Sequence, residues 1–414
     1  MPRTICVLFV VAFTAGGASL VSAADAPAVK PAAEQPAEAK PQAKKEMSSA
    51  PEAKPQAKKE PASAAEAKPQ AKKELSPEMA ALRDRVRQTV GNVFHQPFNT
   101  GESSVADVIQ FCRAFGCRSE IREGGPSGEK LNGITCLCWN IPCGGYSALT
   151  VYEGHLAARV GYGCQESPAQ LAAVLALARV PPEYPARAGQ RVATVADLVE
   201  SEKLACRSGE DQSWRLIALA QYVSQPSWKN AQGEEWSVER MVREELKRAG
   251  GQVPEAISTR LLALSWTLDR RACHHLSLAG DFLAAKKYVA ECQDYLLASQ
   301  NSDGSWGRAA GRDAAAALAA SGGPLEWLVL SLPEERLQGP KIVQAVSYVD
   351  SLLSTRQYSW NFPALGSRDL AAAMTAAHAL YAYDATVFAP ADPSPAAEGK
   401  VTEAGGKPAT PSPK

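Results

Sequence analysis

The central part of the chain alternates between two kinds of segment. The first kind is apolar on nearly all sides, as in Leu261-Leu262-Ala263-Leu264-Ser265-Trp266, and recurs at 168–179, 213–223, 257–268, 313–330 and 369–383. A helix that is apolar all round needs protein on every side. The pattern therefore predicts five buried inner helices.

The second kind of segment carries one apolar stripe and a charged back. Within 281–299 the stripe steps by three and four residues along Phe282, Ala285, Val289, Cys292 and Leu296. That spacing is typical of a helix with one buried face. Segments 194–206, 236–248 and 341–355 share the pattern, so we expect four outer helices.

The two kinds of helix come in a regular order. The apolar segments start 45, 44, 56 and 56 residues apart (213−168, 257−213, 313−257, 369−313). Spacings of this length indicate repeated helix pairs. An inner ring of apolar helices within an outer ring satisfies both patterns, so we expect an all-α fold, an α/α toroid. The rival is an open solenoid, whose inner helices are usually more polar on the concave side.

A short motif supports the toroid. Gln300-Asn301-Ser302-Asp303-Gly304-Ser305-Trp306-Gly307 directly follows one outer helix, and 357–360 holds a degenerate copy, Gln-Tyr-Ser-Trp. The motif resembles the QW repeat of terpenoid cyclases and protein prenyltransferases. Over residues 165–385 this resemblance implies an α/α toroid, with a structural clasp formed by Gln300, Asp303, Gly304 and Trp306. The acidic motifs and the zinc set of those enzymes are missing, so the resemblance implies a fold and gives no information about catalysis.

The two ends of the chain differ from its centre in composition and in hydrophobic pattern. Residues 1–23 carry a positive charge near their start, at Arg3, followed by an apolar run and by the small residues Val21-Ser22-Ala23. This order of features is typical of a secretory signal peptide. Residues 24–77 repeat Glu-Ala-Lys-Pro-Gln-Ala-Lys-Lys-Glu and lack the apolar side chains needed for a core. We therefore expect a secreted or periplasmic protein with a disordered tether, a folded domain over 78–388 and a disordered tail over 389–414.

The charge and hydropathy of the chain limit the kinds of partner that it is expected to bind. The 44 Lys and Arg balance the 44 Asp and Glu, which is untypical of a nucleic-acid-binding protein. After the signal peptide no stretch reaches the roughly 18 apolar residues that a membrane-spanning helix requires. A cell-envelope component or a small ligand is the expected partner.

Cysteines gather in and around a Gly-rich insert at 116–166 that lacks helical periodicity. Beyond Cys6 the chain has nine cysteines, and an exported protein favours their pairing as disulfides that staple the insert. The alternative is a metal site of Cys136, Cys138, Cys143 and His155. Because Cys-x-Cys-x4-Cys is not a standard zinc spacing, we predict no metal and no cofactor.

Candidate catalytic residues lie in two places. His155, Arg159 and Tyr162 lie close together in the insert, among glycines and aromatic residues typical of loop sites. The alternative is that the insert plugs one mouth of the ring. Arg260 begins an apolar inner helix, where its side chain would reach the central cavity.

Candidate ligand-binding residues lie on the inner helices. An apolar cavity would be lined by Trp266, Trp327 and Tyr381, while Asp313 and Asp369 begin two inner helices. Carboxylates at such positions are also ordinary helix N-caps.

Two classes of function fit these observations. The first class is a non-catalytic binding or scaffold domain tethered in the cell envelope, which the absence of the cyclases' acidic motifs favours. The alternative is an enzyme on the same fold, either an isoprenoid cyclase or a polysaccharide lyase that uses Arg with Tyr or His as base. A deep apolar cavity favours the cyclase, an open groove with Arg and His the lyase, and a filled centre the scaffold.

Overall fold

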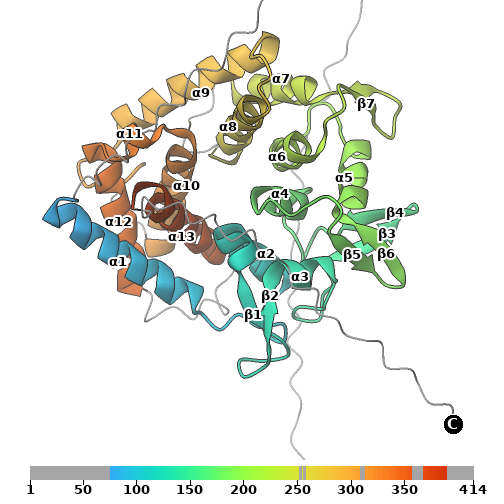
Figure 1. Ribbon diagram of the computed structural model, residues 1–414, viewed down its shortest axis with the longest axis horizontal. Helices are drawn as coiled ribbons and strands as arrows, with labels where there is room; N and C mark the ends of the chain where they lie inside the picture. Colours follow the sequence, from blue (N-terminus) through green and yellow to red (C-terminus); the bar gives the residue numbers. More distant parts are fainter. Residues whose placement is uncertain (1–74, 251–253, 255–257, 308–312, 357–366, 389–414) are drawn as a thin grey trace, which may run out of the picture. The chain divides into compact units, whose positions relative to one another are not determined.

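The computed structural model describes residues 75–250, 254, 258–307, 313–356 and 367–388 (Figure 1). These residues are mostly helical, as predicted. The strands are short and pair two by two as antiparallel hairpins: β1 Glu120–Arg122 with β2 Lys130–Asn132, β3 Leu149–Tyr152 with β4 His155–Ala158, β5 Pro185–Ala188 with β6 Arg191–Thr194, and β7 Trp228–Lys229 with β8 Glu235–Trp236. The predicted signal peptide, most of the tether, the tail and the degenerate motif at 357–360 lie outside the described residues.

The five apolar segments are helices with buried side chains, as their pattern predicts. They are α4 Gln170–Leu177, α6 Ser213–Tyr222, α8 Ser258–Cys273, α10 Ala314–Ser331 and α13 Ser367–Val387. A sixth buried helix, α2 Val105–Phe115, was not predicted, and ten of its eleven residues are buried. Ser104 begins α2 with a capping box, in which Asp107 Oδ2 accepts the Ser104 N–H at 2.8 Å.

These six helices contact one another in chain order. Helix α2 packs against α4, α4 against α6, α6 against α8, α8 against α10 and α10 against α13. Helix α13 in turn packs against α2, so that the succession of contacts returns to its first member. Figure 1 shows α1, α5, α7, α9 and α12 on the outer side of this set.

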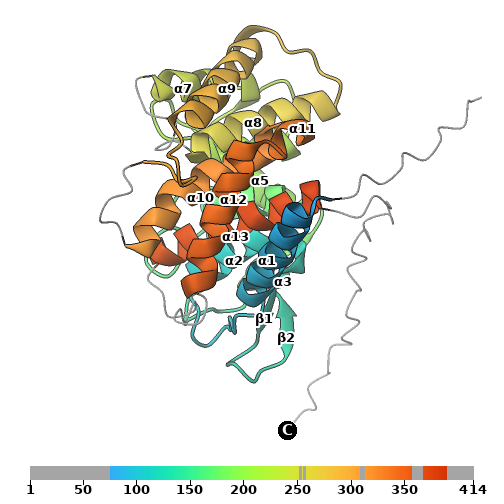
Figure 2. The same ribbon diagram turned by 90° about the vertical axis from the view of Figure 1, so that its left-hand side faces the viewer.

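The predicted outer helices are present and bury one face each. They are α5 Val195–Leu204, α7 Val238–Ala249, α9 Gly280–Ser299 and α12 Pro340–Arg356. The buried residues of α9 include the whole predicted stripe from Phe282 to Leu296. Helix α1 Pro77–Phe94, which was not predicted, lies beside α12 and α13 (Figure 2), and a short turn of helix, α11 Glu334–Leu337, precedes α12.

Buried ion pairs join outer to inner helices at equivalent places. Arg215 at the start of α6 contacts Glu202 of α5 at 3.0 Å, and Arg260 at the start of α8 contacts Glu245 of α7 at 2.7 Å. All four side chains are at most 9% exposed. The arginines are 45 residues apart (260−215) and the glutamates 43 (245−202), so consecutive helix pairs repeat the same contact.

The motif after α9 holds three elements together. The Gln300 side chain donates to the carbonyls of Gly304 and of Lys341, the latter in α12, at 3.0 and 2.9 Å. Asp303 Oδ1 accepts the Ser305 N–H at 3.0 Å and so closes the turn. Trp306 is fully buried, donating from Nε1 to the Leu296 carbonyl at 2.8 Å and from its backbone N–H to Ser321 Oγ of α10 at 3.2 Å.

The 116–166 insert is more regular than its sequence suggests. It contains hairpins β1–β2 and β3–β4, a 3-10 turn at Gly116–Arg118 and a buried helix, α3 Gly133–Cys138, that packs against α2. Asn132 caps α3 by accepting the Thr135 N–H at 3.1 Å. At six residues α3 is too short to show a period, which is why the sequence analysis missed it.

Candidate functional site

A pocket of about 330 Å³ opens among the buried helices α2, α4, α8, α10 and α13. We call it the inner pocket. Its walls combine aromatic with titratable side chains, namely Arg113, Trp266, Asp269, His378 and Tyr381. The volume lies near the lower end of the roughly 300–1,000 Å³ typical of small-molecule sites.

Two residues of the pocket wall, Arg113 and His378, belong to a charged cluster drawn from three helices, whose third member, Glu326, is buried behind them. Arg113 of α2 contacts Glu326 of α10 at 2.6 Å, and His378 Nδ1 of α13 contacts the other carboxylate oxygen at 2.7 Å. Arg113 also donates to Thr375 Oγ1 at 2.9 Å and lies 5.2 Å from the centroid of the Trp214 ring. Glu326 is only 2% exposed, so the cluster is shielded from solvent on the carboxylate side.

The cluster fixes the protonation of Glu326. Burial alone would raise its pKa, but Arg113 and His378 together hold the pKa below the ordinary value of 4.5. An ionised carboxylate only accepts hydrogen bonds, so Nδ1 of His378 must be the donor. In the neutral ring Nε2 is then an acceptor, and Nε2 makes no hydrogen bond to any residue that the structure describes.

The contact between Glu326 and His378 allows His378 either to bind a ligand or to accept a proton from it. A carboxylate that orients a histidine through Nδ1 leaves Nε2 free to accept a hydrogen bond from a ligand, or to act as a general base. Because His378 lines the inner pocket, a molecule bound there lies within its reach.

Of the three predicted cavity aromatics, two line the inner pocket. Trp266 has the Arg270 guanidinium 4.8 Å from its ring centroid, and Tyr381 meets the Phe115 ring edge to face at 5.9 Å. Trp327 instead lies in the core at 1% exposure and donates from Nε1 to Ser265 Oγ at 2.8 Å.

The three predicted charged candidates on the inner helices are not among the residues that line the inner pocket. Asp313 is exposed and caps α10 by accepting the Ala316 N–H at 2.7 Å. Asp369 is exposed in the first turn of α13. Arg260 is engaged with Glu245 and, at 3.3 Å, with Asp211, so its contacts are those of a structural ion pair.

The candidates of the insert lie on a different surface. Arg159 and Tyr162 line an open groove of about 830 Å³, together with Tyr146, whose ring centroid is 5.8 Å from that of Tyr162. Tyr162 is 90% exposed. His155 is exposed at the start of β4 and does not line the groove. The structure therefore joins two of the three residues. Both are exposed, and neither makes an ion pair with another residue of the described ranges.

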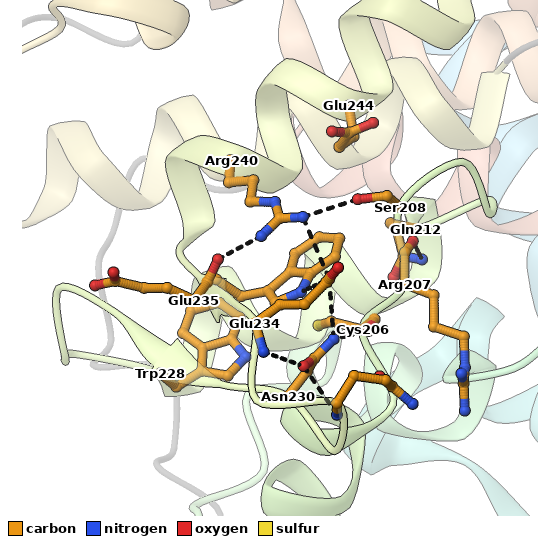
Figure 3. A network of polar contacts seen from close by, with 12 residues as sticks. Cys206, Arg207, Ser208, Gln212, Trp228, Asn230, Glu234, Glu235, Arg240 and Glu244 are labelled. Carbon is orange, nitrogen blue, oxygen red and sulfur yellow. Dashed lines mark hydrogen bonds and ion pairs between the residues drawn. The ribbon is translucent and has the colours of Figure 1, made fainter.

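A polar network around hairpin β7–β8 has a structural role (Figure 3). Glu234 Oε2 accepts from Asn230, from Trp236 Nε1 and from Arg240 at 3.2, 3.2 and 3.3 Å. Arg240 lies 4.1 Å over the Trp236 ring, and Asn230 also donates to the Cys206 carbonyl at 2.9 Å. These groups bind one another and fasten the hairpin between the end of α5 and α7.

The nine described cysteines are free thiols in the structure, and the predicted disulfides stay a prediction. Within the described ranges no three His, Cys, Asp or Glu side chains are placed to hold a metal ion, and Cys136, Cys138, Cys143 and His155 form no such group. In the same ranges α10 alone is long and apolar enough to span a membrane; half of it is buried, and core helices often pass this test.

The chain was compared with known proteins in three ways. No protein-family model, no curated protein sequence and no solved structure matches it.

The charged cluster was missed by the sequence analysis. Glu326 is the one charged residue within the apolar run 313–330 after Asp313, and His378 lies within the apolar run 369–383. A charge within a helix that is apolar all round needs a buried partner. That requirement is the signal that points to Glu326, whereas Arg113 lies in a helix that the sequence analysis did not identify.

Proposed function

We propose that this chain is an exported ligand-binding domain whose inner pocket holds a small molecule. The observation that carries the proposal is a pocket of about 330 Å³ lined by aromatic side chains and by Arg113 and His378. Both of these residues are held by Glu326, which lies behind the wall. Pockets with a mostly apolar wall and a few fixed polar groups are typical binding sites. A scaffold with a filled centre would leave no such pocket beside His378.

We propose the α/α toroid as the architecture, similar to that of terpenoid cyclases and protein prenyltransferases. Three observations support it: buried and amphipathic helices alternate, the motif at 300–307 clasps consecutive pairs, and α13 packs back onto α2. An open solenoid has no contact between its first and last inner helices. The sixth pair consists of α1 and α2.

The pocket also suggests the size and chemistry of its ligand. Its volume is small for a long isoprenoid chain and suits a compact molecule with an apolar ring or patch to face Trp266 and Tyr381. His378 Nε2 would accept a hydrogen bond from a hydroxyl or amide donor on that molecule.

A second candidate, an enzyme on the same fold, is favoured by one observation. The contact of 2.7 Å between Glu326 and His378 Nδ1 is the arrangement that prepares a histidine as general base. His378 would then be the catalytic base, in place of His155 or Tyr162. Turnover of the bound molecule by the wild type but not by His378→Gln would support this candidate over simple binding.

The location follows from the ends of the chain and is likewise a proposal. Residues 1–23 would direct export, and 24–77 would hold the domain away from an envelope surface. Amino-terminal sequencing of the protein from its source tests this point: a mature chain that starts at Ala24 is expected, and one that starts at residue 1 or 2 contradicts export.

Native mass spectrometry of the protein purified from its source tests the binding function. We expect a mass above that of the chain, with the excess released on denaturation. Tyr381→Ala should lower occupancy about tenfold, because a wall of the pocket is removed. Tyr295→Ala, an exposed aromatic on α9, is the matched control and should keep the ligand. A bare chain mass, or a ligand retained equally by Tyr381→Ala, contradicts the proposal.

A further inference from the structure

Two buried cysteines of the insert lie in direct contact. The Sγ atoms of Cys136, in α3, and Cys143, in the segment that follows, are 3.4 Å apart. Both residues are 0% exposed. The carbonyl of Ile141 lies beside both, 3.8 Å from Cys136 Sγ and 3.5 Å from Cys143 Sγ.

The neighbouring cysteines have other contacts. Cys112 Sγ lies 3.2 Å from Ser119 Oγ, and Cys117 Sγ donates to the Ala178 carbonyl at 3.3 Å. Cys138 is buried two residues from Cys136 but makes no sulfur–sulfur contact among the described residues. Proximity therefore distinguishes one pair within a crowded set.

We propose that Cys136 and Cys143 form an intramolecular disulfide when the chain folds in an oxidising environment. Each thiol loses one hydrogen, and an external disulfide takes up the two electrons and two protons and becomes two thiols. A disulfide has an S–S length of about 2.05 Å. The sulfur atoms, 3.4 Å apart in the structure, must therefore approach by about 1.4 Å.

The surroundings determine when the bond forms. The contact with Cys143 and the burial of the site raise the pKa of the Cys136 thiol. The thiolate is the attacking species in disulfide exchange, so exchange in the folded protein is slow. The bond therefore forms during folding, before α3 is covered, and afterwards resists external reductants.

The bond would stiffen the segment that leads to the open groove. Between the two cysteines, Trp139 lies under the Arg187 guanidinium at 4.4 Å, and Asn140 has a φ of +60°. The Asn140 side chain accepts the Leu149 N–H at 2.7 Å and donates to the Leu149 carbonyl at 3.0 Å, joining the segment to β3. A bridge from Cys136 to Cys143 encloses this turn and restricts it in the unfolded chain as well.

Peptide mapping tests the assignment. The full chain is folded with glutathione disulfide, denatured, alkylated without reductant and digested with trypsin and then chymotrypsin, which cuts after Trp139. We expect a linked pair of peptides, lighter by two hydrogen atoms than the two reduced peptides, in which Cys138 is alkylated. Alkylation of both Cys136 and Cys143, or a bond from either to another cysteine, overturns the proposal. This measurement needs no variant and does not depend on a ligand in the inner pocket.

Matched variants give a second test. Cys143→Ser should lower the thermal midpoint of the oxidised protein by about 5 °C, because the closed loop is lost. Cys138→Ser should keep both the linked peptide and the difference in midpoint between protein folded with glutathione disulfide and protein folded in the presence of a reductant. An equal midpoint for reduced and oxidised wild type would contradict a bond in the folded state.

Discussion

Glu326 is an ionised carboxylate inside a helix whose other buried residues are almost all apolar. Its partners Arg113 and His378 come from helices α2 and α13, so one side chain connects the first and last inner helices with α10. Breaking a buried pair costs more than the pair itself contributes, because the remaining charge is left without a partner. The cluster therefore makes three helices mutually dependent.

We predict that Glu326→Gln lowers the free energy of unfolding by about 3–5 kcal/mol at neutral pH. The folded pKa of Glu326 lies below 4.5, so the ionised form stabilises the protein above that pH. The difference between wild type and variant should stay constant down to pH 4.5 and shrink as the pH falls towards the folded pKa. Urea denaturation at a series of pH values measures this difference.

Glu202 provides the control for that measurement. Burial raises its pKa above 4.5 in spite of Arg215, so the folded state takes up the proton first as the pH falls. The stability of wild type relative to Glu202→Gln should then increase as the pH falls towards 4.5. This pH dependence has the opposite sign to that expected for Glu326→Gln. Parallel slopes for the two variants would contradict the assignment of an ionised Glu326.

The clasp after α9 depends on a glycine. Gly304 has a φ of +92°, and an added Cβ would lie 2.5 Å from the Gln344 carbonyl oxygen of α12. A side chain at this position would push α12 away from the turn, since a backbone atom has no room to yield. The clasp is thus a contact between elements as well as a local turn.

We predict that Gly304→Ala costs more than about 2 kcal/mol, the sum of backbone strain and the clash. Gly233→Ala is the matched control: its φ is +79°, but nothing lies within 4 Å of its Cβ position. It should cost about 1 kcal/mol. Chemical denaturation of both variants measures the difference, and equal costs would mean that the contact with α12 contributes nothing.

The sequence predicted the helices whose pattern is uninterrupted. Helices α8, α10 and α13 were predicted from their long apolar runs, and α9 was predicted from its regular apolar stripe. Helix α2 was missed because Asp107, Gln110 and Arg113 interrupt its apolar run. Asp107 is satisfied by its capping box and Arg113 by Glu326, a partner 213 residues away.

The sequence analysis identified only the aromatic part of the site. Trp266 and Tyr381 were predicted to line a cavity because they are large aromatic side chains on apolar inner helices. The contact of Arg113 with Glu326 arises only from the packing of α2 against α13 and of α13 against α10, and no local pattern encodes it. The candidates of the insert were chosen by composition, which does not reveal whether a loop residue is buried.

At the scale of the molecule, the contact of α13 with α2 is the observation that supports our proposal of a closed toroid. Arg87 of α1 also contacts Asp384 of α13 at 2.7 Å, and Thr89 of α1 donates to Asp350 of α12 at 2.7 Å. The first helix pair is therefore attached to the last. In an open solenoid a terminal repeat contacts only its one neighbour.

We predict that removal of residues 75–115 abolishes cooperative unfolding of the whole domain, because α4 and α13 would both lose a buried neighbour. Removal of 24–74, the greater part of the predicted tether, should leave the thermal midpoint unchanged. Calorimetry and circular dichroism measure both deletions. A cooperative transition that survives loss of α1 and α2 would favour the solenoid.

An experimental density map of the protein purified from its source tests the central claim most directly. The account predicts a closed succession of inner helices with density for a compact small molecule against Trp266, His378 and Tyr381. A well-ordered map in which that space is filled by protein side chains or by water alone would contradict it.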